Sequence, residues 1–285
     1  MTSTFTPKQA IAFDGALLKE LQGDVSDKIA LSLLKEEVGL SRMPPSSVIH
    51  DNGCGYGAVT MAVMAADPPA GVRIHATDVN DMYLAELQAT LARHPAWPVE
   101  VETMDACALA FPDRSFDLSV ATFVFLGLRD PVAAAAQVRR TLKPGGTGVV
   151  AVWKDMPWHQ ALENAHVRIR GGADEPMAPF LAAPRYQKDE LARDAAAAGW
   201  SPDELRFVEK AEWLNLGADL KRWVTIAWSF LAAPAGGWKQ RDEDRWDEAV
   251  DSVVEELAQG PWHKVEDGVH KIRMVSDVAI MKKQG

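Results

Sequence analysis

The sequence predicts an α/β fold in which a doubly wound, mostly parallel sheet carries helices on its faces. Strand-like apolar runs alternate with helix-like segments between residues 46 and 153, and this rhythm is typical of βαβ units. A glycine-rich turn, from Gly53 to Gly57, follows the first of the runs. The chain of 285 residues, 47% of them hydrophobic, can also bury a large core without disulfides or metal ions.

The predicted elements follow one another in a regular order. Strands are expected at residues 47–50, 72–77, 99–103, 116–122 and 147–153, with helices within 1–45 and at 58–66, 81–93 and 131–142. Later elements are a loop-rich segment at 157–184, helices at 187–198, 219–232 and 241–259, and strands at 205–214 and 269–281. A long segment with two helices, and not a single compact crossover helix, connects the strand at 205–214 to the last strand. We therefore expect it to lie antiparallel beside the fifth strand.

Charge and composition exclude several classes of partner. The 40 acidic residues outnumber the 30 basic ones, which form no block, so nucleic acid and anionic membranes are not expected partners. The two cysteines, Cys54 and Cys107, lack the paired spacing of a zinc site, and no metal is expected. We see no signal-peptide pattern and no apolar stretch long enough to span a membrane, so a cytoplasmic protein is expected. The oligomeric state is left open.

The first strand runs into the turn Asp51-Asn52-Gly53-Cys54-Gly55-Tyr56-Gly57, which opens a helix. Glycines let a ligand approach the backbone closely, and a helix N-terminus favours a carboxylate or a phosphate. This pattern alone is ambiguous, because Gly53, Gly55 and Ala58 also satisfy the dinucleotide fingerprint G-x-G-x-x-A. A tight turn without a ligand is the plainer alternative.

Two acidic residues follow later strands. Asp78 ends the second strand, where a carboxylate can accept hydrogen bonds from both hydroxyls of a ribose. Asp105 comes after the third strand, where an acceptor oxygen suits the amino group of adenine. NAD-dependent enzymes share the first acid, and the second acid separates this chain from them. A solvated loop residue is the alternative reading of Asp105.

Together these motifs resemble those of class I S-adenosylmethionine-dependent methyltransferases, which have a Rossmann-like fold. The segment from Asp51 to Gly57 resembles the first motif and Asp78 the second, while Asp105 with residues 109–117 resembles the third and fourth. Leu142-Lys143-Pro144-Gly145-Gly146 is similar to the turn before the fifth strand, so the resemblance covers residues 46–153. A short segment from Phe125 to Asp130 is also similar to ubiquinone and menaquinone C-methyltransferases. The sequence His50-Asp51-Asn52 departs from the usual family pattern but keeps the acid and the glycines.

The resemblance implies S-adenosylmethionine as the cofactor and a role for each matching residue. The methionine portion would lie against Asp51 and the turn that contains Gly53, Cys54, Gly55 and Gly57. Asp78, with Val79 beside it, would hold the ribose, and Asp105 with Ala106 would hold the adenine. Phe123 would border the sulfonium. Cys54 is interpreted as a small packing residue and not as a nucleophile.

Acceptor binding is expected outside this core, in helical cap insertions at residues 154–186 and 215–262. Trp158, Phe180, Trp223 and Trp228 are the candidate acceptor-binding residues, together with Phe230. Plain core packing is the alternative for aromatic residues at helical spacing. His159, placed in the loop-rich segment, is the candidate general base for a hydroxyl acceptor, although most histidines in loops are ordinary surface residues.

The sequence therefore predicts one methyltransferase domain over residues 1–285, with N-terminal helices at 1–45 and a cofactor-binding core at 46–153. Its function would be methyl transfer to a small, apolar or aromatic metabolite of secondary or quinone metabolism. The alternatives are a regulatory or partner-binding protein that binds S-adenosylmethionine without transferring methyl, and an NAD-dependent oxidoreductase.

Overall fold

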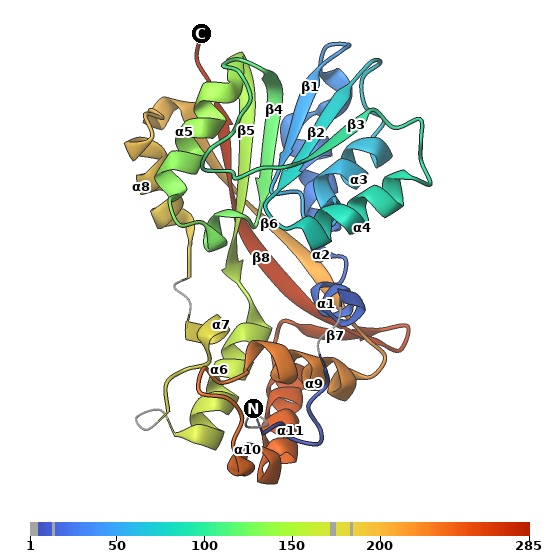
Figure 1. Cartoon of the computed structure of the whole chain (residues 1–285), viewed down its shortest axis with the longest axis vertical. Helices are drawn as coiled ribbons and strands as arrows, with labels where there is room; N and C mark the ends of the chain where they lie inside the picture. The colour runs from blue at the N-terminus through green and yellow to red at the C-terminus, as the bar shows by residue number, and fades with distance from the viewer. Residues whose placement is uncertain (1–4, 13–14, 172–174, 183–184) are drawn as a thin grey trace. The chain divides into compact units, whose positions relative to one another are not determined.

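The computed structural model describes residues 5–12, 15–171, 175–182 and 185–285 (Figure 1). Contacts divide the chain into two compact units, which we describe separately. Unit 1 consists of Met1–Val25, Asp155–Pro184 and Glu212–Met274, and unit 2 of Ser26–Lys154, Arg185–Ala211 and Val275–Gly285. The expectation of one domain with cap insertions stays a prediction. No helix in the described ranges is long and apolar enough to cross a membrane.

A mixed sheet forms the framework of unit 2, in the strand order β3-β2-β1-β4-β5-β8-β6. Its strands are β1 (Val48–Asn52), β2 (Arg73–Asp78), β3 (Val99–Thr103), β4 (Phe116–Thr122), β5 (Leu142–Asp155), β6 (Leu205–Gly217) and β8 (Val269–Lys282). Pairing is parallel from β3 through β2, β1 and β4 to β5. All five residues of β1 are buried, as in a strand covered on both faces. The predicted α/β fold is confirmed, and each predicted strand lies within a few residues of an observed one.

The last strand, β8, runs antiparallel beside β5. Lys283 and the turn at Gly145 and Gly146 exchange backbone hydrogen bonds: the Lys283 amide donates to Gly146 (3.0 Å) and the Gly145 amide to the carbonyl of Lys283 (2.9 Å). Met281 lies opposite Gly148, so the residue numbers in the two strands run in opposite directions. The prediction of an antiparallel last strand is confirmed.

The chain reverses its direction of travel across the sheet at β1. From β1 it continues outward to β2 and β3, then returns to the other side of β1 as β4. In open α/β sheets, ligands bind at such a switch point, outside the carboxyl ends of the strands. This arrangement brings the segments that follow β1, β2 and β3 together at the carboxyl end of the sheet.

Helices cover the sheet of unit 2, and two of them begin at a side-chain cap (Figure 1). They are α2 (Val25–Ser32), α3 (Ala58–Ala65), α4 (Asp81–Leu91), α5 (Pro131–Thr141) and α8 (Lys188–Ala197). The Asn80 side chain caps α4 by accepting from the amide of Met82, and Asp130 caps α5 by accepting from that of Ala133. Helix α4 packs on β2 and β3, and α5 packs against α8.

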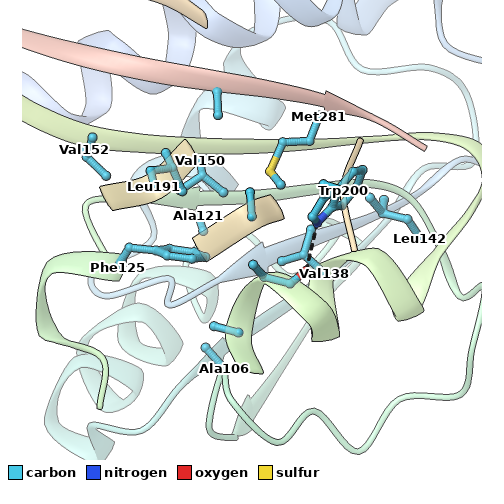
Figure 2. Packing of buried hydrophobic residues seen from close by; sticks show 14 of the residues in the cluster. Ala106, Ala121, Phe125, Val138, Leu142, Val150, Val152, Leu191, Trp200 and Met281 are labelled. Carbon is cyan, nitrogen blue, oxygen red and sulfur yellow. Dashed lines mark hydrogen bonds between the residues drawn. The ribbon is translucent and has the colours of Figure 1, made fainter. Parts of the chain in front are cut away.

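A hydrophobic cluster joins α5 and α8 to the sheet (Figure 2). Trp200 is buried in it, and its indole nitrogen donates to the carbonyl of Ala135 (3.1 Å). Val138, Leu191 and Met281 pack in the same cluster. The indole thus gains both apolar packing and a partner for its polar atom, as a buried tryptophan requires.

Unit 1 is mainly helical. Its helices are α1 (Gly15–Gln22), α6 (Pro157–Arg170), α7 (Pro179–Ala182), α9 (Leu220–Leu231), α10 (Gln240–Asp244) and α11 (Trp246–Gln259). Helix α11 packs against α6 and α9. The predicted helix at 241–259 is divided at Arg245, which leaves helical geometry with φ −112° and ψ 16°.

The interpretation of 157–184 as loop-rich is wrong for its first half, because α6 covers 14 residues there. Pro157 at the first helical position suits a helix start, and Ala161, Leu162, Ala165 and Ile169 form a buried stripe at helical spacing. Residues 172–174 and 183–184 of the segment lie outside the described residues, as does Phe13 near the N-terminus.

A hairpin that the sequence reading missed joins β7 (His263–Glu266) to the start of β8. Asp267 and Gly268 form its two-residue turn, with φ of 52° and 75°. Positive φ at both positions is the requirement of a type I′ turn, and Asp-Gly is a favoured sequence for it. That dipeptide was the pattern that could have revealed the hairpin.

Candidate functional site

The glycine-rich turn after β1 combines tight packing with one open position. All three glycines have positive φ, of 73° at Gly53, 52° at Gly55 and 91° at Gly57. A Cβ at Gly53 would collide with Val124, and one at Gly57 would collide with Leu87. A Cβ at Gly55 would meet no described atom within 4 Å. The backbone at Gly55 therefore offers open space for a ligand.

Asp51 anchors the turn to the following helix. Its carboxylate oxygen Oδ2 accepts from both the amide (2.9 Å) and the hydroxyl (2.7 Å) of Thr60 in α3. The side chain is fully buried, and this burial raises the pKa of Asp51 to about 6 despite the bonds from Thr60. The structure thus shows Asp51 holding the turn, and its contact with the methionine portion stays a prediction. Thr60 is a supporting residue that the sequence reading missed.

Asp78, at the end of β2, is bonded to the same turn. Its Oδ2 accepts from the amide of Gly55 (2.9 Å), and its Oδ1 accepts from the amide of Asn80 (2.9 Å). A carboxylate oxygen can accept more than one hydrogen bond, so both oxygens keep acceptor capacity for hydroxyl groups. The neighbouring apolar side chain of Val79 is 65% exposed. An exposed apolar surface beside a carboxylate fits a flat, partly polar ligand.

Asp105 and Ala106 follow β3 at the same carboxyl end of the sheet. The amide of Met104 donates to the carbonyl of Asp78 (2.9 Å), which keeps the two strand ends in register. Asp105 is exposed, and its Oδ1 accepts from the amide of Cys107 (2.8 Å), while Ala106 is buried. The predicted residues Gly55, Asp78 and Asp105 therefore lie on the segments that follow three neighbouring strands.

The side chain of Cys54 belongs to the apolar core and not to this group of polar residues. It is buried and packs with Ala76, Leu84 and Leu87. Burial, followed by the charges of Asp51 and Asp78, raises the pKa of its thiol, so the thiol stays protonated near neutral pH. These observations support the interpretation of Cys54 as a packing residue.

Phe123 lies just beyond β4 in an unusual backbone conformation. Its φ is 62°, a value that is uncommon for a bulky residue and that tends to occur at functional sites. Its amide donates to the carbonyl of Ala151 (2.8 Å), and its ring stacks on Trp153 of β5 with centroids 3.7 Å apart. Trp153 is a candidate site residue that the sequence reading passed over, and its position at the end of a predicted strand could have marked it.

Three of the residues predicted to serve the acceptor lie together in unit 1. Trp158 and His159 are in the first turn of α6, and Phe180 is in α7. The Trp158 ring centroid lies 6.1 Å from that of Phe180, and His159 lies 6.2 Å from the same ring. The expected loop position of His159 is wrong: the side chain is buried in a helix, with Nδ1 3.5 Å from Oε1 of Glu163.

The other three predicted acceptor residues lie on α9 of unit 1, where Phe230 is partly buried and the two tryptophans are deeper. Trp223 and Trp228, both on α9, are only 2% and 1% exposed. Trp228 lies against the guanidinium of Arg170, whose central carbon is 4.9 Å from the ring centroid. The burial of both tryptophans agrees with a role in core packing. Their role in acceptor binding stays a prediction.

Comparison with known proteins supplies a family for this site. Residues 49–146 match the family model described as a methyltransferase domain. The chain is 27% identical to the 2-methyl-6-phytyl-1,4-hydroquinone methyltransferase of Synechocystis over 71% of this chain and 59% of the relative. It is 26% identical to a ubiquinone/menaquinone biosynthesis C-methyltransferase of Cupriavidus pinatubonensis, over 64% of this chain and 75% of the relative.

Two further similarities bear on activity and on fold. A carboxy-S-adenosyl-L-methionine synthase of Shewanella loihica is 28% identical over 44% of this chain and 54% of its own length. This synthase and the Synechocystis enzyme are thus matched over less than two thirds of their lengths. The solved YcgJ protein of Bacillus subtilis shares the fold, with a TM-score of 0.55 at 15% identity, over 90% of this chain and 100% of that one.

The geometry of unit 2 fits the cofactor of this family. The open position at Gly55, the acceptor capacity of Asp78 and the exposed side chain of Val79 meet the needs of a ligand with a polar tail, a ribose and a flat base. The family model covers the strands β1 to β4 that present these groups. Residues 49–146 thus match a methyltransferase domain, and the comparisons support S-adenosylmethionine as its cofactor.

Proposed function

We propose that the protein transfers the methyl group of S-adenosylmethionine to a small, apolar or aromatic acceptor of quinone or secondary metabolism. The observation that carries the methyl-donor half of the proposal is the turn, where open space at Gly55 lies beside the carboxylate of Asp78. The relatives named for a phytyl hydroquinone and for ubiquinone and menaquinone support the acceptor half.

The residues of unit 2 have separate tasks in this proposal. Asp78 would accept hydrogen bonds from the ribose hydroxyls and Asp105 from the adenine amino group, while the backbone at Gly55 leaves room for the methionine portion. The ring of Phe123, held by its stack on Trp153, would border the sulfonium. Bound cofactor supplies an activated methyl group with a neutral leaving group. Alignment of the two reactants can then contribute ~7–11 kcal/mol to catalysis, and a fixed base is optional.

For a hydroxyl acceptor we propose His159 as the general base. A carboxylate close to one ring nitrogen can orient the imidazole, and Oε1 of Glu163 lies 3.5 Å from Nδ1 of His159. A substitution His159→Gln would then lower kcat for a hydroxyl acceptor and leave the affinity for S-adenosylhomocysteine unchanged. Equal kcat in both proteins would remove His159 from the mechanism.

A second candidate is a protein that binds S-adenosylmethionine without methylating an acceptor. The synthase relative favours it, because that protein is named for making a derivative of the cofactor and not for methyl transfer. The NAD-dependent alternative has no such support, since the matching family is a methyltransferase domain.

The deciding experiment is a transfer assay with S-adenosylmethionine labelled in the methyl group. Hydroquinones that carry prenyl or phytyl tails are the first acceptors to test, with an extract of metabolites as a broad screen and Asp78→Ala as the control with weakened cofactor binding. We expect label in an organic-soluble product that the Asp78→Ala variant forms more slowly when S-adenosylmethionine is below saturation. Tight binding of S-adenosylhomocysteine without any labelled product would favour the second candidate. A melting temperature raised by NAD and not by S-adenosylhomocysteine would favour the NAD-dependent oxidoreductase.

A further inference from the structure

His75, Glu100 and Glu102 gather on one face of the sheet, at its β3 edge. The strand register places His75 of β2 opposite Glu100 of β3, with Glu102 two residues further along. The alternate residues Val99 and Val101 pack with Leu87 on the other face. Since side chains alternate across a strand, both glutamates share the face of His75.

The three side chains converge through their ligand atoms. Nδ1 of His75 lies 3.4 Å from Oε2 of Glu100 and 3.9 Å from Oε1 of Glu102. One ligand atom from each residue lies within 4.8 Å of the other two. The glutamate side chains are 68% and 48% exposed, so they can rotate, whereas the His75 side chain is only 19% exposed.

Aromatic packing holds the imidazole in this orientation. The His75 ring meets Phe111 edge to face at 5.3 Å and Phe116 at 5.8 Å. Its Nδ1 is shielded from solvent and has no hydrogen-bond partner among the described residues. A buried polar nitrogen normally has a partner, and two carboxylates within 4 Å of it attract positive charge. A cation between the three groups would supply a partner for the nitrogen and offset the negative charge.

One imidazole nitrogen and two carboxylate oxygens are donors that suit a divalent transition-metal ion. Zn²⁺ binds imidazole nitrogen and carboxylate oxygen at about 2.0–2.2 Å in a tetrahedral arrangement, which separates the ligand atoms by about 3.3 Å. The observed distances of 3.4 and 3.9 Å come close to this value, and small rotations of the exposed glutamates would complete the approach. Hard ions such as Mg²⁺ prefer sites built from oxygen alone.

We propose that His75, Glu100 and Glu102 form a binding site for a divalent transition-metal ion, with Zn²⁺ as the first candidate and water in the remaining position. The ion would link β2 to the edge strand β3, a few residues before Asp78 and Asp105. Its expected effect is to hold these two strands together. This inference does not depend on the proposed methyl transfer.

The test is titration of the untagged full-length protein with Zn²⁺, followed by calorimetry and by the melting temperature. We expect saturable binding to one site and a rise in melting temperature that EDTA reverses. The double variant Glu100→Gln, Glu102→Gln keeps the size of both exposed side chains, and it should bind Zn²⁺ at least 10-fold more weakly. Asp67→Asn, at an exposed carboxylate outside the cluster, is the matched control and should bind as the original protein does.

A second histidine pair provides the sharpest contrast. Nε2 of His263 and Nδ1 of His270 lie 2.9 Å apart on the β7–β8 hairpin and could also attract Zn²⁺. If His263→Gln abolishes binding and the double glutamate variant does not, the proposal is overturned. It also fails if the original protein and the double variant bind equally, because His75 then forms only an ion pair with the glutamates. Replacement by Co²⁺ should give visible absorption of a four- or five-coordinate ion in the original protein and not in the double variant.

Discussion

At the carboxyl ends of β1 and β2 in unit 2, polar groups border open space, whereas the tryptophans of α9 in unit 1 lie inside the packing. Gly55 and Asp78 keep room and acceptor capacity for a ligand. Trp223 and Trp228 are almost entirely buried, although their aromatic character first suggested acceptor binding. In this chain the residues of the glycine and acid motif border open space, whereas the tryptophans of α9 are part of a packed core.

Two buried polar residues, one in each unit, are satisfied in different ways. In unit 1, Arg170 is buried in an ion pair with Asp242 (2.8 Å) and is stacked on Trp228. In unit 2, neutral contacts satisfy His50, whose Nε2 lies 2.9 Å from the hydroxyl of Thr77 while its ring stacks on Phe116. The first arrangement joins α6 to α10, and the second lies in β1, immediately before the glycine-rich turn. The predictions below separate stability from binding in these two places.

The largest effect is expected from Trp228→Ala. Removing a large indole from a buried position should lower the free energy of unfolding by ~3–5 kcal/mol, because a cavity remains and Arg170 keeps only Trp238 as an aromatic partner among the described residues. Phe180→Ala is the matched control, since that ring is 46% exposed and should cost far less stability. Urea unfolding measures both. Acceptor kinetics of the same variants then test binding: a normal melting temperature with a raised KM in Trp228→Ala would reverse our assignment to the core.

The second effect concerns pH, and it comes from two neighbouring residues of β1. Burial lowers the pKa of His50 to about 3, so its contribution to stability is present above pH 6.5 and is lost as the pH falls towards 3. Burial raises the pKa of Asp51 to about 6, so its contribution is present below pH 3.8 and is lost as the pH rises through 6. Between pH 4 and 6 the two contributions oppose each other.

Single substitutions should therefore expose opposite slopes. On acidification from pH 6.5 to 4, Asp51→Asn should lose about 2–3 kcal/mol of unfolding free energy relative to the original protein, and His50→Gln should gain about 3 kcal/mol. The asparagine carbonyl can still accept from Thr60, which limits other damage. Urea unfolding across this pH range measures the slopes. Parallel curves for all three proteins would mean that neither group titrates in the folded state as described.

The smallest effect, on binding and not on folding, is expected from Asp78→Ala. Loss of its hydrogen bonds to the ribose should weaken the binding of S-adenosylhomocysteine by ~1.5–3 kcal/mol, about 10- to 150-fold in Kd. The carboxylate also holds the amide of Gly55, so Asp78→Asn, which retains one acceptor oxygen, should lose less. Calorimetric titration gives both values. An unchanged Kd in Asp78→Ala would contradict the ribose assignment.

Features that depend on neighbouring residues could be predicted from the sequence, and contacts between residues distant in the chain could not. The strands of unit 2 could be predicted because each is a short apolar run ended by a turn, and β3 and β4 match their predicted bounds. Helix α6 was missed within the segment interpreted as loop-rich, although Pro157 at the first helical position favours a helix start. His159 was consequently placed in a loop.

By itself, the sequence determined the order of strands and helices from β1 to β5, the glycine-rich turn and the two acids that follow β2 and β3. These features depend on local backbone preferences and on short apolar patterns, which neighbouring residues control. Only the tertiary structure decided that Asp51 bonds Thr60, that Trp153 supports Phe123, and that Trp228 packs on Arg170. The same holds for the convergence of His75 with Glu100 and Glu102. Such contacts join residues that are distant in sequence, and only the pairing of strands and the packing of helices bring their side chains together.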